Sequence, residues 1–216
     1  MILAIDGPAG AGKSTVAKQL ARELGLTFLD TGAMYRAVTW IALERGVDVH
    51  DEAACAAVAR SMRIDFDDQG RVRVDGRPGE PRIRAEDVTA AVSHVAAHPA
   101  VRRVVVPMQR EEARRRGGVV AEGRDVGSVV FPAADFKFYL DASPEVRAER
   151  RARELGRPDL YGEILLAMRE RDRLDTTRAD SPLVRADDAF LVDSDALDAA
   201  GVVRAMLLCV RARARA

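Results

Sequence analysis

The sequence predicts an α/β fold in which a central parallel sheet of five strands is flanked by helices. Five short segments have the composition of buried or half-buried strands, at residues 2–5, 27–30, 119–121, 136–140 and 190–192. Segments with helical spacing of apolar residues lie between them. A glycine-rich loop also joins the first strand to the first helix. Because strands that alternate with helices pair in parallel through right-handed crossovers, these observations together indicate a three-layer fold.

The composition indicates one domain without a strong charge bias. The 216 residues suit a single α/β domain with room for small inserts. Lys plus Arg and Asp plus Glu both total 34, so no net field favours nucleic acid or an anionic membrane. No apolar run is long enough to cross a bilayer, and the chain begins inside the first predicted strand, without room for a signal peptide. The two cysteines have no disulfide or metal spacing. We therefore expect a cytoplasmic protein without membrane or nucleic-acid partners.

The glycine-rich loop carries the strongest chemical signal in the sequence. Residues 7–14 are GPAGAGKS, which matches the phosphate-loop (P-loop) pattern G-x-x-x-x-G-K-[S/T] at every fixed position. In such a loop, backbone N–H groups and the start of the next helix surround an anion. Lys13 is placed to reach the β- and γ-phosphates, and Ser14 to put its hydroxyl on Mg²⁺. An ordinary helix-capping turn is the alternative, but the flanking strand and helix favour a nucleoside triphosphate site. The predicted triphosphate-binding residues are Gly7, Pro8, Ala9, Gly10, Ala11, Gly12, Lys13, Ser14 and Thr15.

The scarcity of lysine and the absence of asparagine limit how this chain can recognise phosphate and base. Lysine occurs only at positions 13, 18 and 137, and asparagine does not occur at all. Apart from Lys13, phosphate recognition therefore falls to arginine, whose planar fork binds phosphate oxygens in pairs. The Asn-Lys-x-Asp element by which switch GTPases recognise guanine is excluded, which disfavours a regulatory switch.

The segment after the second strand predicts two helices. Residues 31–36, TGAMYR, begin a helix that we expect Thr31 to cap. A second helix is predicted over residues 51–62, with Asp51 as its N-cap.

A small inserted sheet is predicted next. Between residues 63 and 84 the apolar period changes to two, with turn signals at Gln69-Gly70 and Asp75-Gly76. The alternating segments are short and lie within helical sequence. We interpret them as an antiparallel insert that is too small to be a domain.

Further along, the sequence predicts a strand whose carboxyl end carries polar residues. Helices are predicted over residues 85–97 and 101–116, and the buried strand at 119–121 then runs into EGRD at 122–125. Sheets of this class hold ligands at the carboxyl ends of their parallel strands. Glu122 at this position can order the water shell of Mg²⁺, but a solvated strand end explains it equally well, so both interpretations stay open.

An arginine-rich stretch precedes the last strand. Residues 147–178 contain nine arginines, with helical runs at 145–155 and 160–174. A solvated helix face with ion pairs is the usual meaning of such a pattern. Beside a nucleotide site, the same helix–loop–helix is suited to be a lid that closes over phosphates. A closing helix is predicted over residues 197–209.

Several sequence blocks, in this order and spacing, resemble bacterial cytidylate kinases. They are IDGPAGAGKST, LDTGAMYR, the inserted sheet, EGRDVGSVVFP and RDRLDTTR. The phosphate loop alone occurs in many families, whereas the later blocks are more specific. The resemblance spans essentially the full chain and implies a single kinase domain that uses ATP and Mg²⁺ to convert CMP or dCMP to CDP or dCDP. It also implies a monomer, with a monophosphate-binding region at about 31–100, an insert at about 63–84 and a lid at about 148–160.

The resemblance also implies roles for individual residues. Lys13 and Ser14 would serve the ATP phosphates and Mg²⁺, with Glu122 acting on the ion through water. The residues implied for CMP binding are Thr31, Tyr35, Arg36, Ser93, Arg102, Arg124, Asp125, Arg171, Asp175 and Arg178. The residues expected to act in catalysis are Lys13, Arg124, Arg171 and the lid arginines Arg153 and Arg157. Thr31 and Glu122 replace the Ser and Asp of some family members but keep their functional groups.

Two alternatives remain. A phosphate acceptor is largely ionised near neutral pH and needs no general base, whereas a hydroxyl acceptor calls for a carboxylate such as Asp30 or Asp125. A kinase of another small acceptor, of the UMP, shikimate or gluconate type, is therefore the nearest enzyme alternative. A nucleotide-dependent binding module without catalysis is the other.

Overall fold

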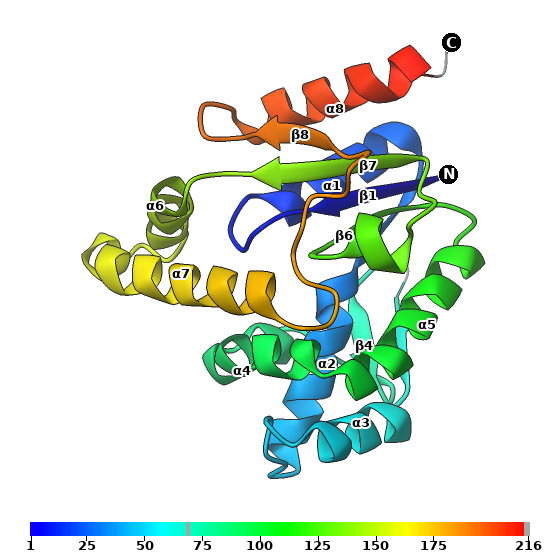
Figure 1. The fold of residues 1–216 in the computed structure, drawn as a ribbon, viewed down its shortest axis with the longest axis vertical. Helices are drawn as coiled ribbons and strands as arrows, with labels where there is room; N and C mark the ends of the chain where they lie inside the picture. Colours follow the sequence, from blue (N-terminus) through cyan, green and yellow to red (C-terminus); the bar gives the residue numbers. More distant parts are fainter. Residues whose placement is uncertain (68–69, 214–216) are drawn as a thin grey trace.

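The central sheet has five strands, all paired in parallel, as the sequence predicts (Figure 1). The computed structural model describes residues 1–67 and 70–213. The strands lie in the order β2, β6, β1, β7, β8. Their bounds are Ile2–Asp6 (β1), Thr27–Asp30 (β2), Val119–Gly123 (β6), Phe136–Asp141 (β7) and Phe190–Asp193 (β8). Asp30 pairs in register with Glu122, and Asp6 with Gly123, so three polar strand ends meet at one edge of the sheet.

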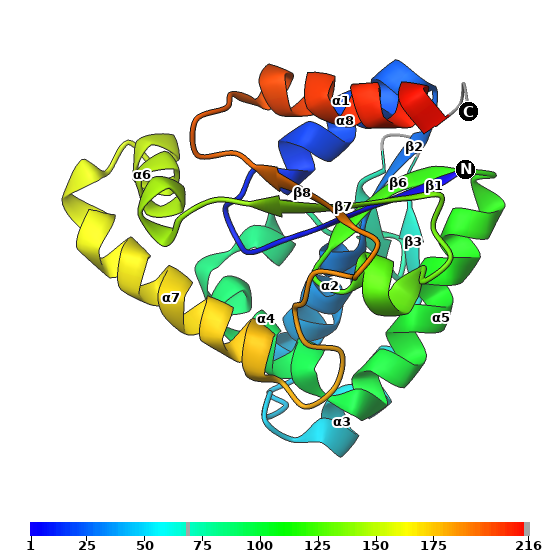
Figure 2. The ribbon, with the colours of Figure 1, turned by 45° about the horizontal axis from the view of Figure 1, so that its top comes forward.

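Helices cover both faces of this sheet and complete the three layers (Figure 2). On one face, α1 and α8 pack on β1 and β7 through Leu20, Phe138 and Met206. On the other face, α5 packs on β2 and β6 through Leu29 and Val106. The helices are α1 (Lys13–Leu24), α2 (Thr31–Glu44), α3 (Glu52–Ser61), α4 (Glu86–Ala97), α5 (Pro99–Arg115), α6 (Pro144–Glu154), α7 (Tyr161–Thr177) and α8 (Ala199–Arg213). Within residues 1–67 and 70–213, no helix is long and apolar enough to span a membrane.

The predicted insert is present and has three short strands. They are β3 (Ile64–Phe66), β4 (Val72–Val74) and β5 (Arg77–Pro78), paired antiparallel in that order. Asp75 and Gly76 form the turn between β4 and β5 with φ values of 50° and 77°, as a two-residue hairpin turn requires. The expected turn at Gln69 lies outside the described residues.

The insert shares a second hydrophobic core with α2, α3, α4 and the start of α5. A 3₁₀ turn, η1 (Arg82–Arg84), leads from the insert into α4. The fully buried side chains of this core include Met34, Ile41, Val74, Ile83 and Val88. This core therefore supports the part of the molecule that lies opposite the phosphate loop, across the carboxyl edge of the central sheet.

The caps of α2 and α3 test two predictions. The prediction for α3 is confirmed, because the Asp51 side chain accepts a hydrogen bond from the Ala54 N–H. The prediction for α2 is wrong: Asp30 is the N-cap and accepts from the Ala33 N–H at 2.9 Å. Thr31 is instead the first helical residue, and its hydroxyl donates to the Glu122 carbonyl at 2.6 Å. The hydroxyl therefore joins α2 to the end of β6.

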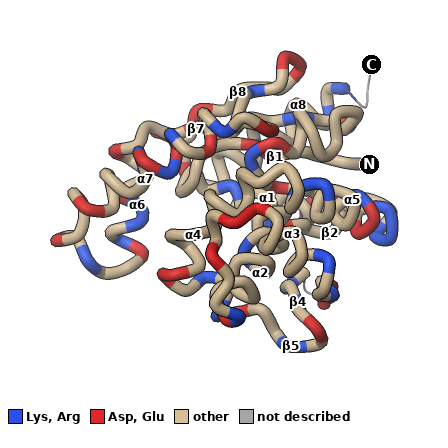
Figure 3. The backbone as a smooth tube through the Cα atoms, turned by 60° about the horizontal axis from the view of Figure 1, so that its bottom comes forward, with Lys and Arg blue, Asp and Glu red and all other residues tan. Residues whose placement is uncertain are grey.

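The arginine-rich stretch forms an arm of two packed helices, α6 and α7, joined through the 3₁₀ turn Pro158–Leu160 (Figures 1 and 2). Basic and acidic residues are interspersed along both helices (Figure 3). Arg153 pairs with Glu149, and Arg173 with Glu170, on exposed faces. This part of the stretch matches the interpretation as a solvated face with ion pairs.

The second core supplies a test of the fold. We expect Ile83→Ala to lower the free energy of unfolding by about 2–4 kcal/mol, because Ile83 is fully buried and truncation leaves a cavity. Urea denaturation measures the change. Leu166→Ala is the matched control, since Leu166 is 68% exposed and should change stability by no more than about 0.5 kcal/mol. Equal losses in the two variants would contradict this account of the core.

Candidate active site

A cavity lies at the carboxyl ends of β1, β2 and β6, where the strand register brings the polar ends together. The phosphate loop forms one wall, and α2, η1, α4, the turn after β6 and α7 form the others. Most residues predicted for the site line this one cavity. They are Ala9, Gly10, Lys13, Ser14, Thr31, Tyr35, Arg36, Ser93, Glu122, Arg124, Asp125, Arg171, Asp175 and Arg178.

The phosphate loop has the conformation that its glycines predict. Gly12 precedes α1 with φ 89° and no side-chain cap, so the first N–H groups of the helix are left for a ligand. A Cβ atom at Gly7 would lie 2.0 Å from the Leu140 carbonyl oxygen, so only glycine fits there. The Lys13 ammonium donates to the Pro8 carbonyl at 2.6 Å, and burial together with Arg124 lowers the pKa of Lys13 to about 7.

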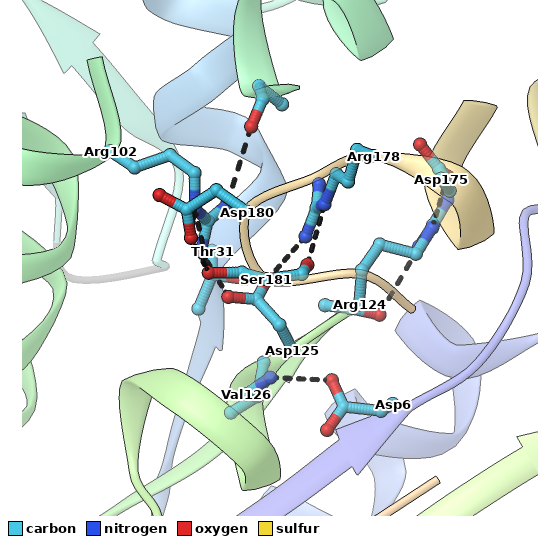
Figure 4. A network of polar contacts seen from close by, with 12 residues as sticks. Asp6, Thr31, Arg102, Arg124, Asp125, Val126, Asp175, Arg178, Asp180 and Ser181 are labelled. Atoms are coloured by element: carbon cyan, nitrogen blue, oxygen red, sulfur yellow. Dashed lines mark hydrogen bonds and ion pairs between the residues drawn. The ribbon is translucent and has the colours of Figure 1, made fainter. Parts of the chain in front are cut away.

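On the facing walls, two buried aspartates organise the arginines (Figure 4). Asp175 accepts from Arg124 Nε at 2.8 Å and from the Ser93 hydroxyl at 3.1 Å. Burial raises the pKa of Asp175, but Arg124 and Arg171 more than offset that effect and hold this pKa below its usual value. The carboxylate is therefore ionised and keeps a fixed geometry between α4, α7 and the end of β6.

Asp125 has the same function on the other side of the cavity. One carboxylate oxygen accepts from Arg178 Nη2 at 3.2 Å, and the other accepts from Arg102 (Figure 4). Arg102 lies behind the wall and not on it: its side chain is 3% exposed, and its guanidinium stands 5.5 Å from the Tyr35 ring centre. The structure thus places Arg102 against Asp125 and Tyr35, not on the cavity surface where a base reader is expected.

Three buried polar atoms in the cavity wall have no hydrogen-bond partner among the described residues. They are the Tyr35 hydroxyl, one Glu122 carboxylate oxygen and Arg171 Nε. Burial raises the pKa of both Tyr35 and Glu122, with Asp30 adding to the effect on Glu122. A buried polar atom without a hydrogen bond is unfavourable, so this wall is suited to bind a ligand to which Arg171 Nε donates and from which Glu122 accepts.

The structure also contains site residues that sequence reasoning missed. Asp6 accepts from the N–H groups of Val126 and Gly127, both at 2.7 Å, and so holds the turn that carries Arg124 and Asp125. Its place at the end of the first strand was the available signal. Arg84 lines the cavity from η1 and pairs with Asp30 at 2.5 Å, although no motif includes it.

A third missed residue, Arg147, connects the phosphate loop to the arm. Its guanidinium donates to the Ala9 carbonyl at 2.9 Å and binds both Asp172 oxygens, at 3.2 and 2.6 Å. Nothing in the run of nine arginines distinguishes this residue before folding. By contrast, the predicted lid residues Arg153 and Arg157 are 73% and 56% exposed, pair with Glu149 and Asp159, and do not line this cavity.

A parallel sheet whose phosphate loop faces an arginine-lined cavity defines a P-loop phosphotransferase. Comparison with known families identifies the particular one. The family model described as cytidylate kinase matches residues 3–212. The chain therefore belongs to the cytidylate kinase family, as the resemblance of its sequence blocks predicts.

Proteins named cytidylate kinase match this chain over nearly its full length and nearly their own. A cytidylate kinase of Mycobacterium leprae is 46% identical, in a match that covers 100% of this chain and 98% of the relative. A cytidylate kinase of Rhodococcus opacus is 48% identical, with 99% and 96% covered. A bifunctional pantoate ligase/cytidylate kinase of Synechococcus is 47% identical over 95% of this chain but only 43% of its own length, so the chain spans less than half of that protein. Among solved structures, TT1252 from Thermus thermophilus has a TM-score of 0.50 at 20% identity, with 99% of this chain and 97% of that one covered, which supports the fold alone.

Asp6 gives the site a measurable pH dependence. Burial raises the pKa of Asp6 from 3.8 to about 6, so its stabilising contribution is complete below pH 3.8 and is lost as pH rises through about 6. In Asp6→Asn the side chain stays neutral. We expect the wild-type chain to lose about 1 kcal/mol of unfolding free energy relative to Asp6→Asn between pH 5 and pH 7. Urea denaturation at several pH values measures this difference, and a constant difference would show that Asp6 does not titrate in this range.

Proposed function

We propose that this chain transfers the γ-phosphoryl group of ATP to CMP or dCMP, giving CDP or dCDP and ADP. The observation that carries the proposal is that the phosphate loop and a cluster of arginines face one cavity. Six side chains of basic residues and four of acidic residues line it, so the formal charge of its walls is positive by two units. A nucleoside monophosphate has a charge of about −1.5 to −2 at pH 7 and fits this balance. The full-length relatives named cytidylate kinase support the same acceptor.

We assign the acceptor phosphate to Arg36, Arg124 and Arg171. Burial, together with Arg171 and Arg84, lowers the pKa of Arg36 to about 9, and burial together with Arg124 lowers the pKa of Arg171 to about 10. Burial is the larger cause of both shifts, and repulsion between neighbouring cations adds to it. A phosphate at this place would relieve that repulsion and would give Arg171 Nε a hydrogen-bond partner.

We assign the cytosine to the side of the cavity formed by Ser93, Asp125 and Arg178. Cytosine presents an amino donor beside a ring nitrogen and a carbonyl that accept, and these three side chains offer the complementary groups. In this proposal Arg102 is a positioning residue that holds Asp125 and does not touch the base. We assign Thr31, Tyr35 and Asp175 to the part of the cavity that binds the phosphate and the sugar.

The donor side is proposed to be the phosphate loop, with Lys13 on the ATP phosphates. A second hollow borders the same loop and is lined by Gly12, Thr15, Arg150, Arg153 and Leu197, among others. It lies on the other side of the loop from the arginine cluster and is suited to the rest of ATP. Closure of the arm would bring Arg153 and Arg157 toward the transferred group.

Ser14 and Glu122 fit a hydrated Mg²⁺. Both line the cavity beside Lys13, and a Glu122 oxygen there is buried without a partner among the described residues. Mg²⁺ prefers oxygen ligands and keeps several of its waters, so Ser14 would bind it directly and Glu122 through water. When bound, the ion neutralises charge on the phosphates.

The residues of this chain then act mainly by position and charge. The acceptor oxygen is already ionised, so no side chain has to remove a proton before it attacks. The arginines offset the repulsion between two polyanions and hold them within bonding distance. We also propose that the protein works as a monomer, as the resemblance of its sequence blocks implies, and in the reducing cytoplasm, where its two free cysteines would stay unpaired.

The proposal is tested by ADP formation from Mg·ATP with CMP, dCMP, UMP, AMP, GMP and shikimate as acceptors. We expect strong turnover with CMP and dCMP, weak turnover with UMP and none with the others. Turnover with shikimate alone would leave a P-loop kinase but would overturn the arginine and cytosine assignments. ATP binding with no turnover on any acceptor would favour the binding module.

A variant pair tests the phosphate assignment. We expect Arg124→Gln to lower kcat/KM for CMP roughly 100-fold, because it removes a charge-assisted contact to the acceptor and leaves Asp175 with only the longer ion pair to Arg171, at 4.0 Å. Arg173→Gln is the matched control, since Arg173 lies on exposed α7 surface and pairs with Glu170. Steady-state kinetics give the comparison, and thermal melts confirm that both variants fold. Similar kinetics for the two variants would remove Arg124 from the site.

A further inference from the structure

Arg84 is a cavity residue that the motifs leave unassigned. It ends η1, the turn between the inserted sheet and α4, and its side chain is 43% exposed. Its Nη2 donates to Asp30 Oδ2 at 2.5 Å, and its Nε stands 3.5 Å from Glu80. The guanidinium therefore reaches from the insert to the end of β2, across the mouth of the cavity that also contains Arg36 and Arg171.

The two partners of the Asp30–Arg84 pair differ in freedom. Asp30 is fixed, because its Oδ1 caps α2 through the Ala33 N–H and its side chain is 9% exposed. The Arg84 guanidinium lies near the surface, at the end of a long side chain that is 43% exposed. Arg84 is therefore the member of the pair that can move to a new partner.

The backbone beneath Arg84 is held by a second cavity arginine. Arg36 Nη1 donates to the Ile83 carbonyl at 3.2 Å and to the Thr89 hydroxyl at 2.8 Å. These contacts place η1 beside the arginines assigned to the acceptor phosphate. Burial is the main cause of the lowered pKa of Arg36 and of Arg171, and the charge of Arg84 contributes in the same direction to both.

The balance of charges favours an exchange of partners. Asp30 supplies Arg84 with one negative charge in close contact, and Glu80 a second at the longer distance of 3.5 Å, whereas one phosphate group supplies nearly two charges and three acceptor oxygens. Arg36 and Arg171 would draw that phosphate to within reach of the same guanidinium. After Arg84 leaves, Asp30 Oδ1 keeps its cap on α2, but Asp30 Oδ2 loses its hydrogen bond, so the exchange requires the phosphate contacts to outweigh that loss.

We propose that Arg84 is a ligand of the acceptor phosphate that exchanges Asp30 for this phosphate when the acceptor binds. The inference rests on the proposed function and adds a residue to it. It makes the inserted sheet responsive to a phosphorylated acceptor, because η1 follows the insert directly. It also makes Arg84 a residue that distinguishes a nucleoside monophosphate from the nucleoside.

Calorimetric titration of the full chain with CMP and with cytidine tests the proposal. We expect Arg84→Gln to raise the Kd of CMP about tenfold or more and to leave the weak binding of cytidine unchanged. Arg82→Gln is the matched control, because Arg82 belongs to the same turn but pairs with Asp87 through two hydrogen bonds, both 2.6 Å, away from the cavity. Arg84→Lys, which keeps one positive charge, should give an intermediate Kd and serves if Arg84→Gln does not fold.

A double variant separates partner exchange from a general charge effect. Asp30→Asn keeps an oxygen for the α2 cap but releases Arg84, so it should lower the Kd of CMP about threefold or more. That gain should vanish in Asp30→Asn/Arg84→Gln. Persistence of the gain, or unchanged CMP binding in Arg84→Gln, would overturn the inference. Failure of the wild-type chain to phosphorylate CMP would instead overturn the proposed function, so the two failures are distinguishable.

Discussion

Balance between buried arginines and buried carboxylates is the constraint on which this structure depends. Several guanidinium groups converge on one cavity, and buried acids hold most of them there, whereas Arg36 is held by the Ile83 carbonyl and the Thr89 hydroxyl. Asp125 joins Arg102 of α5 to Arg178 after α7, and Asp175 joins α7 to the end of β6. Because removing one member of a buried pair leaves an uncompensated charge, the site and the packing of these helices are stabilised together. The acids are therefore part of the fold as much as part of the site.

The sheet makes this arrangement possible by bringing strand ends together. Parallel strands place Asp6, Asp30 and Glu122 at one edge, in residue positions that lie far apart along the chain. Each has a different place there: Asp6 holds the turn after β6, Asp30 caps α2, and Glu122 has a buried oxygen without a hydrogen-bond partner among the described residues. One edge of the sheet thus fixes loop geometry and helix placement and also carries the oxygen that we propose for the metal ion.

The sequence predicted what depends on local pattern and missed what depends on burial. Strand positions, the phosphate loop and the inserted hairpin follow from residues within a few positions of each other, and the structure has them. Contacts such as Ser93 with Asp175, 82 positions apart, have no local pattern that could announce them. The nine arginines look alike in sequence, yet Arg147 is 3% exposed and Arg153 is 73% exposed. Even the α2 cap was off by one residue, because the Thr31 hydroxyl bonds to β6 across the fold and leaves the cap to Asp30.

Arg147 connects the phosphate loop to the helix that carries part of the arginine cluster. It binds the phosphate loop through Ala9 and α7 through Asp172. Asp172 follows Arg171 directly and precedes Asp175 by less than one helical turn, so the phosphate loop, the arm and the arginine cluster share one short piece of α7. A shift of α7 would change the contacts on the loop side and on the cluster side together. The contacts thus connect the phosphate loop to the arginine cluster through one helix held by ion pairs, without a separate connecting element.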